Sequence, residues 1–305
     1  MRGLLYILTA VMLMAGCGQS YEEKRQQQHK RRKQLLREDS LALKIAVMPT
    51  LDCLPLFLAK DHHFFDSLGA DVRLKMFTAQ MDCDTALQRG RVEGAVTDLV
   101  RAERMIKQGT PLAYLTATNA YWQLYSNRMA RIKKLEQLDD KMVGMTRYSA
   151  TALLADAIVD SAKLQQERVF KIQVNDVNIR LKMLIGGEID AVLLTEPQAT
   201  LAREAHHQLL LDSRRLDIQF GAIALREVLP GDTLRQRQVE VLKKGYNQAC
   251  DSLSAYGLRH FADILSKHYK LREDQLDSLI LSMKFAKIAE PREADIERAR
   301  KWLNQ

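Results

Sequence analysis

From residue 43 onward, short runs of apolar and β-branched residues alternate with longer stretches whose apolar positions have helical spacing. The short runs predict strands over 43–50, 71–77, 92–99, 111–118, 141–145, 169–174, 189–196, 208–213 and 220–226. Helices are expected between most of these strands, one of them over 53–65, and helices over 234–256, 258–267, 273–283 and 291–303 fill the C-terminal part. This order favours an α/β fold with two doubly wound parallel sheets, each covered by helices on both faces.

The N-terminal segment has a different pattern. An apolar run from Leu4 to Ala15 follows Arg2 and is too short for a membrane-spanning anchor, so residues 1–16 are predicted to be a secretory signal peptide. Small residues stand directly before Cys17, as in the lipobox of bacterial lipoproteins. We therefore expect acylation of Cys17, which anchors a protein without a membrane-spanning helix. The alternative is an ordinary cleaved signal that happens to contain a cysteine.

Residues 17–42 are expected to form a lipidated, charged tether with few apolar positions. Seven basic and four acidic residues lie between Ser20 and Ser40, so this segment and Arg2 together hold half of the net charge of +8. The charge therefore does not indicate a nucleic-acid-binding domain. The basic cluster either contacts anionic lipid headgroups or forms a solvated spacer. Composition, with 47% hydrophobic and 28% charged residues, is ordinary for a soluble extracytoplasmic domain.

Two segments of this domain carry the same pattern of helix, tight turn and strand. They are ALQRGRVEGAVTDL, ending at Leu99, and MLIGGEIDAVLLTEP, ending at Pro197. With KIAVMPTLDCLPLFLAKDHHFF and LLLDS, they make the chain similar to type II periplasmic solute-binding proteins. The resemblance is to the NMT1-like branch, which covers nitrate-, sulfonate- and thiamine-precursor-binding components of ABC transporters, and it spans about residues 43–303.

The resemblance implies two lobes that clamp a solute by hinge closure. Lobe one would comprise residues 43–118 plus 222–305, lobe two residues 124–220, and the hinge crossovers residues 119–123 and 217–221. It also implies a binding component without cofactor or catalysis, whose partners are a small solute, an ABC permease and its ATPase. Together with the predicted acylation of Cys17, this gives a lipid-anchored protein on the periplasmic side. The sequence departs from the family at His63, where a glycine is common, so a position that tolerates positive φ carries a costlier residue. Cys53 and Cys83 stand where small or polar residues are usual.

Candidate ligand contacts follow from the strand pattern, because ligands of open α/β sheets bind beyond the carboxyl ends of the strands. We expect both lobes to direct these ends at one enclosed pocket able to hold a metabolite. The predicted ligand-binding residues are Thr50, Asp52, Gln80, Thr97, Asp98, Asn119, Trp122, Tyr148, Ser149, Thr151, Asn175 and Glu196.

Several of these residues have an alternative role. Asp52, Asp98 and Ser149 could instead cap helix N-termini. Glu is a poor N-cap, so Glu196 is expected to contact the ligand rather than form a surface ion pair. The helix that begins near Ser149 would also offer free N–H groups to an anionic substituent. Tyr121 and Trp122 either stack on a ligand ring or cover the hinge.

The charge of these strand ends bears on the solute. Arg147 is their one cation, against five carboxylates at Asp52, Asp82, Asp98, Asp176 and Glu196. Two inward-facing carboxylates would disfavour a small anion. This favours a neutral or amine-bearing heterocycle of the thiamine-pyrimidine type over a sulfonate or nitrate.

Other chemistry is less supported. The Cys and His residues lack metal-ligand spacing, so no metal is expected. Cys53 and Cys83 follow neighbouring strands and are either bridged or two buried thiols. An enzyme on the same scaffold, as in thiamine-pyrimidine synthesis, would need an activated nucleophile or a histidine in the cleft, and no histidine stands at the strand ends. A sensor or docking lipoprotein that has lost transport is a third possibility, whereas a dinucleotide-binding fold is excluded by the lack of its glycine motif.

Overall fold

The computed structural model describes residues 21–280 and 284–305. The chain separates into two compact units, residues 1–42 and residues 43–305. The predicted signal peptide and Cys17 lie outside the described residues. The first unit contributes one described helix, α2 (Tyr21–Leu41), in which no residue is buried. A helix of 21 residues is roughly 30 Å long.

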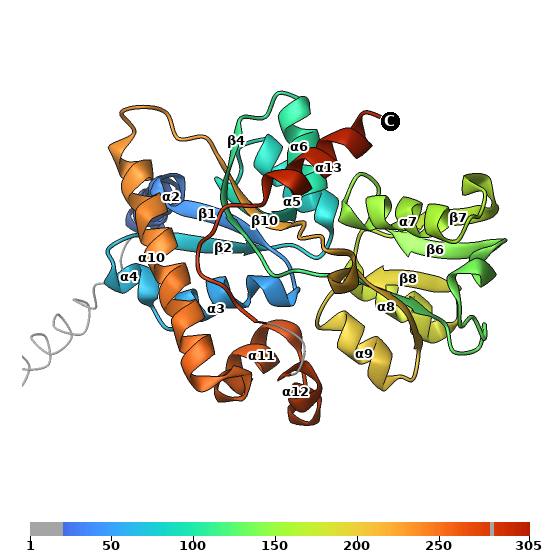
Figure 1. Ribbon diagram of the computed structural model, residues 1–305. Coiled ribbons are helices and arrows are strands. Elements are labelled where there is room, and N and C mark those ends of the chain that lie inside the picture. Colours follow the sequence, from blue (N-terminus) through green and yellow to red (C-terminus); the bar gives the residue numbers. More distant parts are fainter. Residues whose placement is uncertain (1–20, 281–283) are drawn as a thin grey trace, which may run out of the picture. The chain divides into compact units, whose positions relative to one another are not determined.

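The second unit is built on two five-stranded sheets, which Figure 1 shows with their helices. Sheet one has the spatial order β2 (Val72–Met76), β1 (Leu43–Val47), β3 (Gly94–Asp98), β10 (Gly221–Arg226) and β4 (Leu112–Ala117). Sheet two has the order β7 (Val169–Gln173), β6 (Lys141–Met145), β8 (Ala191–Leu194), β5 (Gln123–Ser126) and β9 (Gln208–Asp212). The strand and helix pattern of the sequence thus corresponds to a two-lobed α/β fold, which confirms the predicted fold class.

The sheets are mixed rather than wholly parallel. Strand β10 runs antiparallel to both β3 and β4, and β5 runs antiparallel to both β8 and β9. In each lobe the reversed strand is one that the chain reaches by crossing from the other lobe: residues 118–122 join β4 to β5, and residues 217–220 precede β10. The lobes are therefore connected by two chain segments that lie between strands.

Helices cover both faces of each sheet. On sheet one, α3 (Leu54–Asp61) and α10 (Thr233–Tyr256) pack on one face, and α5 (Gln80–Gln88) and α6 (Leu99–Lys107) on the other. On sheet two, α7 (Ala150–Ser161) covers one face, and α8 (Val177–Gly186) and α9 (Gln198–Glu204) cover the other. The remaining C-terminal helices are α11 (Ala262–Tyr269), α12 (Glu273–Ile280) and α13 (Glu293–Leu303).

One apolar cluster is shared by the two lobes. Leu99 and Val100 of α6 belong to the same buried cluster as α7, and Ile296 and Ala299 of α13 complete it. Helix α13 contacts both α6 and α7 (Figure 1). Because burying apolar surface is favourable, this continuous core holds the lobes together in the described conformation.

The prediction of a single helix over 53–65 is wrong. The chain forms α3, which ends at Asp61, and a separate short helix, α4 (Phe64–Ser67). The break falls at His63, whose φ of 56° lies in the left-handed region. This confirms that a position suited to glycine carries a costlier residue.

Candidate functional site

The carboxyl ends of β1 and β3 face lobe two across a small enclosed space, here called the cleft cavity. Its volume is about 30 Å³, which is room for roughly two water molecules. Six of the predicted ligand-binding residues line this space. They are Thr50, Asp52, Gln80, Thr97, Asp98 and Trp122.

The cleft cavity is smaller in this conformation than the metabolite-sized pocket that the sequence predicts, because the lobes meet closely around it. The backbone N–H of Leu51 donates to the Glu196 carbonyl at 2.8 Å, and the Gln198 side chain donates to the Pro49 carbonyl at 2.9 Å. Each of these hydrogen bonds joins lobe one to lobe two. A solute larger than a few atoms therefore enters only after the lobes have separated.

Two carboxylates face the cleft cavity from lobe one. Asp52 is buried and its Oδ2 lies 3.5 Å from the Thr118 hydroxyl, while burial raises the pKa of its carboxyl. Asp98 is 2% exposed and caps α6 by accepting the Arg101 N–H at 3.0 Å. The alternative role of Asp98 as a helix cap is thus confirmed, and the same side chain also lines the cavity.

Asp98 makes a second contact that crosses to the other lobe. Its Oδ1 also accepts the N–H of Ala150, the first residue of α7, at 3.0 Å. Burial raises the pKa of the Asp98 carboxyl to about 6, although the nearby Arg101 opposes the shift. The folded protein therefore holds the Asp98 proton more tightly than the unfolded chain does.

This raised pKa predicts a pH dependence of stability. The raised pKa stabilises the folded protein at low pH. We expect this contribution of Asp98 to the free energy of unfolding to be fully present below pH 3.8, the ordinary pKa of Asp, and to be lost as the pH rises through about 6. The loss is about 2–3 kcal/mol. Replacing the carboxyl with an amide in D98N removes this dependence while keeping an acceptor oxygen. Denaturant unfolding of both proteins between pH 4 and 7 checks it, and parallel pH profiles would contradict it.

The cleft cavity is bordered by polar atoms that lack partners. Among the described residues, the Thr97 Oγ1 and the Gln80 Oε1 are buried and make no hydrogen bond. Buried polar atoms are nearly always satisfied in folded proteins. These two atoms therefore mark positions at which water or a ligand can bind.

Lobe two contributes less to the cavity than expected, since its one lining residue is Thr195. Ser149 is the N-cap of α7 and accepts the Thr151 N–H at 3.1 Å, as its alternative role anticipated. The Thr151 hydroxyl accepts the Thr146 N–H at 2.9 Å. Both side chains thus accept hydrogen bonds from backbone N–H groups of residues 146–151, and neither lines the cavity.

Glu196 is buried but lies outside the cavity lining. Its Oε1 accepts the Tyr121 hydroxyl at 2.8 Å, and its Oε2 accepts the Thr200 N–H at 3.0 Å. These two hydrogen bonds tie the first crossover to α9, and the ligand contact of Glu196 stays a prediction. Tyr121 covers the hinge, with the Arg214 guanidinium 4.1 Å from its ring centre, whereas Trp122 faces the cavity.

Three further predicted residues lie elsewhere. Tyr148 is half exposed, and the guanidinium of Arg104 lies 4.3 Å from its ring centre. Asn175 contacts Met81 at the rim, with its Nδ2 3.1 Å from the sulfur. Asn119 lines a groove of about 400 Å³ at the crossovers, here called the hinge groove. None of these three lines the cleft cavity.

The cation beside the cavity is Arg101 rather than Arg147, which is exposed. Arg101 is 3% exposed, and its guanidinium donates to Asp84 at 3.0 Å and to the Gln80 carbonyl at 2.6 Å. Burial lowers the pKa of Arg101, but Asp84 outweighs it and the pKa lies above its usual value. Sequence reasoning missed this residue because it lies within α6, beyond the strand end. The other lining residues outside the predicted set are Met48, Val96, Ala120 and Thr195.

The described cysteines are free thiols. Cys53 packs with α10 on one face of sheet one, whereas Cys83 packs with Ala46 and Ala95 on the other face. The two thiols belong to different apolar clusters, and the open question of a bridge resolves to two buried thiols. Burial raises the pKa of Cys83 to about 12.

In the described segments, no three His, Cys, Asp or Glu side chains gather closely enough to hold a metal ion. Over residues 21–280 and 284–305, no helix has the length and apolar character that crossing a membrane requires.

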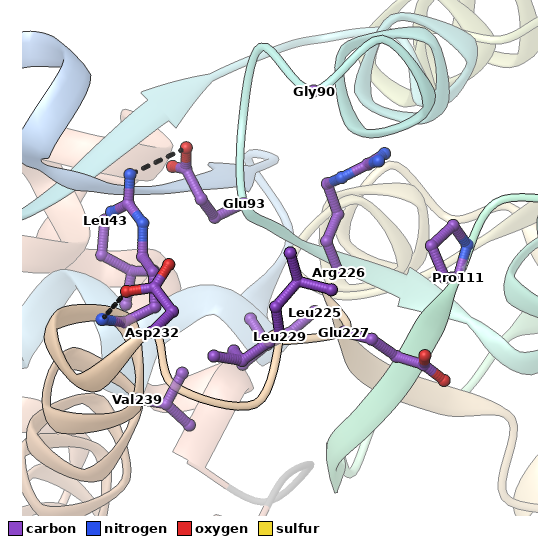
Figure 2. Close-up of a pocket in the computed structure, with 12 residues that line it drawn as sticks. Leu43, Gly90, Glu93, Pro111, Leu225, Arg226, Glu227, Leu229, Asp232 and Val239 are labelled. Atoms are coloured by element: carbon purple, nitrogen blue, oxygen red, sulfur yellow. Dashed lines mark hydrogen bonds and ion pairs between the residues drawn. The ribbon is translucent and has the colours of Figure 1, made fainter.

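A larger cavity of about 350 Å³ lies at the opposite edge of sheet one, where β1 and β4 begin (Figure 2). Glu93, one of its charged side chains, is already partnered: it accepts the backbone N–H of Lys44 at 2.7 Å and forms an ion pair with Arg235 at 3.4 Å. No predicted ligand-binding residue lines it. Volume alone therefore does not make this cavity the site.

Comparisons with known proteins agree with this geometry. The family model described as NMT1/THI5 like matches residues 50–253. No curated protein matches the chain. Among solved structures, the ligand-binding component of an ABC-type import system from Staphylococcus aureus, with zinc bound, superposes with a TM-score of 0.72 at 17% identity, covering 87% of this chain and 91% of that one.

Two further structures share the fold. The periplasmic aliphatic sulphonate binding protein of Escherichia coli has a TM-score of 0.71 at 15% identity and covers 86% of each chain. The periplasmic nitrate-binding protein of Synechocystis PCC 6803 has a TM-score of 0.66 at 14% identity, covering 82% of this chain and 74% of that one. The chain therefore belongs to the NMT1/THI5-like family and has the two-lobed α/β fold of periplasmic binding proteins.

Proposed function

We propose that this chain is the solute-binding component of an ABC importer, held outside the cytoplasm by a lipid on Cys17. It delivers a small organic solute to a permease and its ATPase and performs no chemistry itself. The cleft between the lobes is its solute site. Family membership and the fold shared with import-system binding components support this proposal.

The observation that carries the ligand class is the pair of carboxylates at Asp52 and Asp98, both buried and both lining the cleft cavity. The guanidinium beside them is already paired with Asp84. A ligand that brings positive charge or N–H donors satisfies these carboxylates, whereas an anion meets like charge in a buried setting. Trp122 adds an aromatic face. We therefore propose an amine-bearing or neutral heterocycle of the thiamine-pyrimidine type.

A binding role is favoured over catalysis by the same lining. Among the described residues around the cleft cavity there is no histidine, lysine or cysteine side chain. Nucleophilic and general acid–base chemistry most often relies on such groups. Incubating the protein with any ligand that it binds and analysing the mixture by mass spectrometry tests this, since a changed ligand would indicate an enzyme.

The ligand class predicts a binding experiment. In a thermal-shift screen of aminopyrimidines, alkanesulfonates and nitrate, we expect an aminopyrimidine to raise the Tm saturably. For that compound, D52N should weaken the Kd at least about thirtyfold, because a buried charge pair loses its partner. Asp82 is an exposed acid in the first turn of α5, after the neighbouring strand β2, and D82N should leave the Kd within about threefold of the wild type.

Two outcomes would count against the proposal. A broad metabolite screen without any hit, together with native mass spectrometry that finds no retained small molecule, would exclude solute binding. A saturable response to sulfonate or nitrate in the wild-type protein would retain solute binding but overturn the ligand class.

A further inference from the structure

Two helix N-termini from different lobes converge on one carboxylate. Helix α6 of lobe one contributes the N–H of Arg101, and helix α7 of lobe two contributes the N–H of Ala150. Both donate to the same atom, the Oδ1 of Asp98, at 3.0 Å. Helix α6 has nine residues and α7 has twelve, so each provides a full helix dipole.

Helix N-termini are positive ends of helix dipoles and carry free N–H groups, so they attract anions. Here two such ends meet next to a guanidinium that is 3% exposed, that of Arg101. Without the side chain of Asp98, these groups would form an enclosed site for a small anion. The protein fills that site with its own carboxylate.

A second observation points to a ligand at this place. The hydroxyl of Thr97, the residue before Asp98, is buried and has no hydrogen-bond partner among the described residues. Thr97 is 6% exposed and lines the cleft cavity, as Asp98 does. The space beside the carboxylate is therefore lined by a polar group, the Thr97 hydroxyl, whose hydrogen-bonding capacity is unused within the described residues.

We propose that Asp98 is a specificity-determining residue: its carboxylate occupies an anion-binding site between α6 and α7 and thereby excludes anionic solutes from the cleft. The proposal deepens the proposed function, on which it rests in taking the cleft as the solute site. An approaching sulfonate, nitrate or carboxylate group would find both helix ends occupied and would meet a like charge. Solved structures of the same fold include proteins named for sulphonate and nitrate binding. The fold of this chain is therefore compatible with such anions, and it is the carboxylate of Asp98 that prevents them from binding.

Removing the carboxylate should create anion binding. In D98A, sodium formate supplies the missing carboxylate and sodium nitrate supplies a planar anion of similar size. We expect each to raise the Tm of D98A saturably, by about 2–5 °C at roughly ten times its Kd. Sodium chloride at equal ionic strength corrects for general salt effects. The wild-type protein should show no saturable response.

Two further variants serve as matched controls. D98N keeps an oxygen acceptor in the same place, so its site stays filled and should not respond. Asp176 also caps a helix, accepting the N–H groups of Asn178 and Ile179 at the start of α8. Among the described residues its carboxylate accepts backbone N–H groups from α8 alone, and D176A should show no saturable response either.

If D98A does not yield folded protein, D98S carries the same test, because a serine still caps α6 but is too short to fill the space before α7. A response of D98A or D98S to formate and nitrate that does not exceed that of D176A overturns the proposal. This outcome is distinct from failure of the proposed function, which depends on solute binding by the wild-type protein and not on anion binding by a variant.

Discussion

Replacing Arg180 with alanine is expected to lower the free energy of unfolding by about 3–5 kcal/mol. Arg180 is 2% exposed, and its guanidinium donates to the carbonyls of Val174 and Leu193 at 3.1 and 2.6 Å and to the Thr146 hydroxyl at 2.9 Å. It thus ties together the carboxyl ends of β6, β7 and β8. The substitution leaves buried acceptors unsatisfied and opens a cavity.

Burial lowers the pKa of Arg180 to about 10, so the folded protein bears a cost for its charge. R180M removes that cost and fills more of the space, so it should lose less stability than R180A. Arg168, which is exposed and paired with Asp139, provides the control. R168A should leave the urea midpoint nearly unchanged. A midpoint for R180A equal to that of R168A would contradict the role assigned to Arg180.

Replacing Gly221 with alanine should affect both stability and binding. A Cβ at this position would clash with the Thr118 hydroxyl and lie 2.7 Å from the Ala120 Cβ, so the two crossovers must move apart. Overpacking of this kind costs about 1–3 kcal/mol, and occasionally more. Thr118 also contacts Asp52 in the cleft cavity. The shift should therefore reach the site and weaken the binding of an aminopyrimidine found by the screen.

The matched control for this hinge variant is Gly186, the last residue of α8. There a new Cβ would meet a flexible group, the Glu188 carboxylate, at 3.2 Å. Alanine is a better helix former than glycine, so G186A should be neutral or slightly stabilising. Equilibrium unfolding and calorimetric titration of both variants give the comparison. Equal stability and equal Kd for G221A and the wild type would show that the crossovers tolerate separation.

Much of the fold follows from local sequence pattern, and the exceptions have physical causes. Strand β5 was not predicted, because its four residues, Gln123–Ser126, are too few to show a clear apolar period. The reversed direction of β10 could not be predicted either, because a buried strand has the same pattern in both orientations. The single helix over 53–65 was predicted because Phe64 and Phe65 were included in the helical apolar pattern that begins before the break at His63.

The sequence pattern predicts which residues follow the strands and so lie near the site. It does not predict which neighbour each of these side chains contacts. Thr97 and Asp98 were found because they follow a buried strand. The partners of Ser149 and Glu196 depend on which neighbour each side chain meets in the folded protein, and local pattern does not encode this. Arg101 has one sequence signal, its position three residues after a strand-end aspartate, on the face of α6 that turns back toward the site.

The position of β10 in sheet one also determines the order in which the protein can fold. A nascent chain that has reached residue 220 already contains every strand of sheet two, but β3 and β4 still lack the strand that belongs between them. The edges of both remain open to pairing with other chains until residues 221–226 emerge. We therefore expect lobe two to form first and lobe one last. The slow step is the long-range pairing of β10 with β3 and β4.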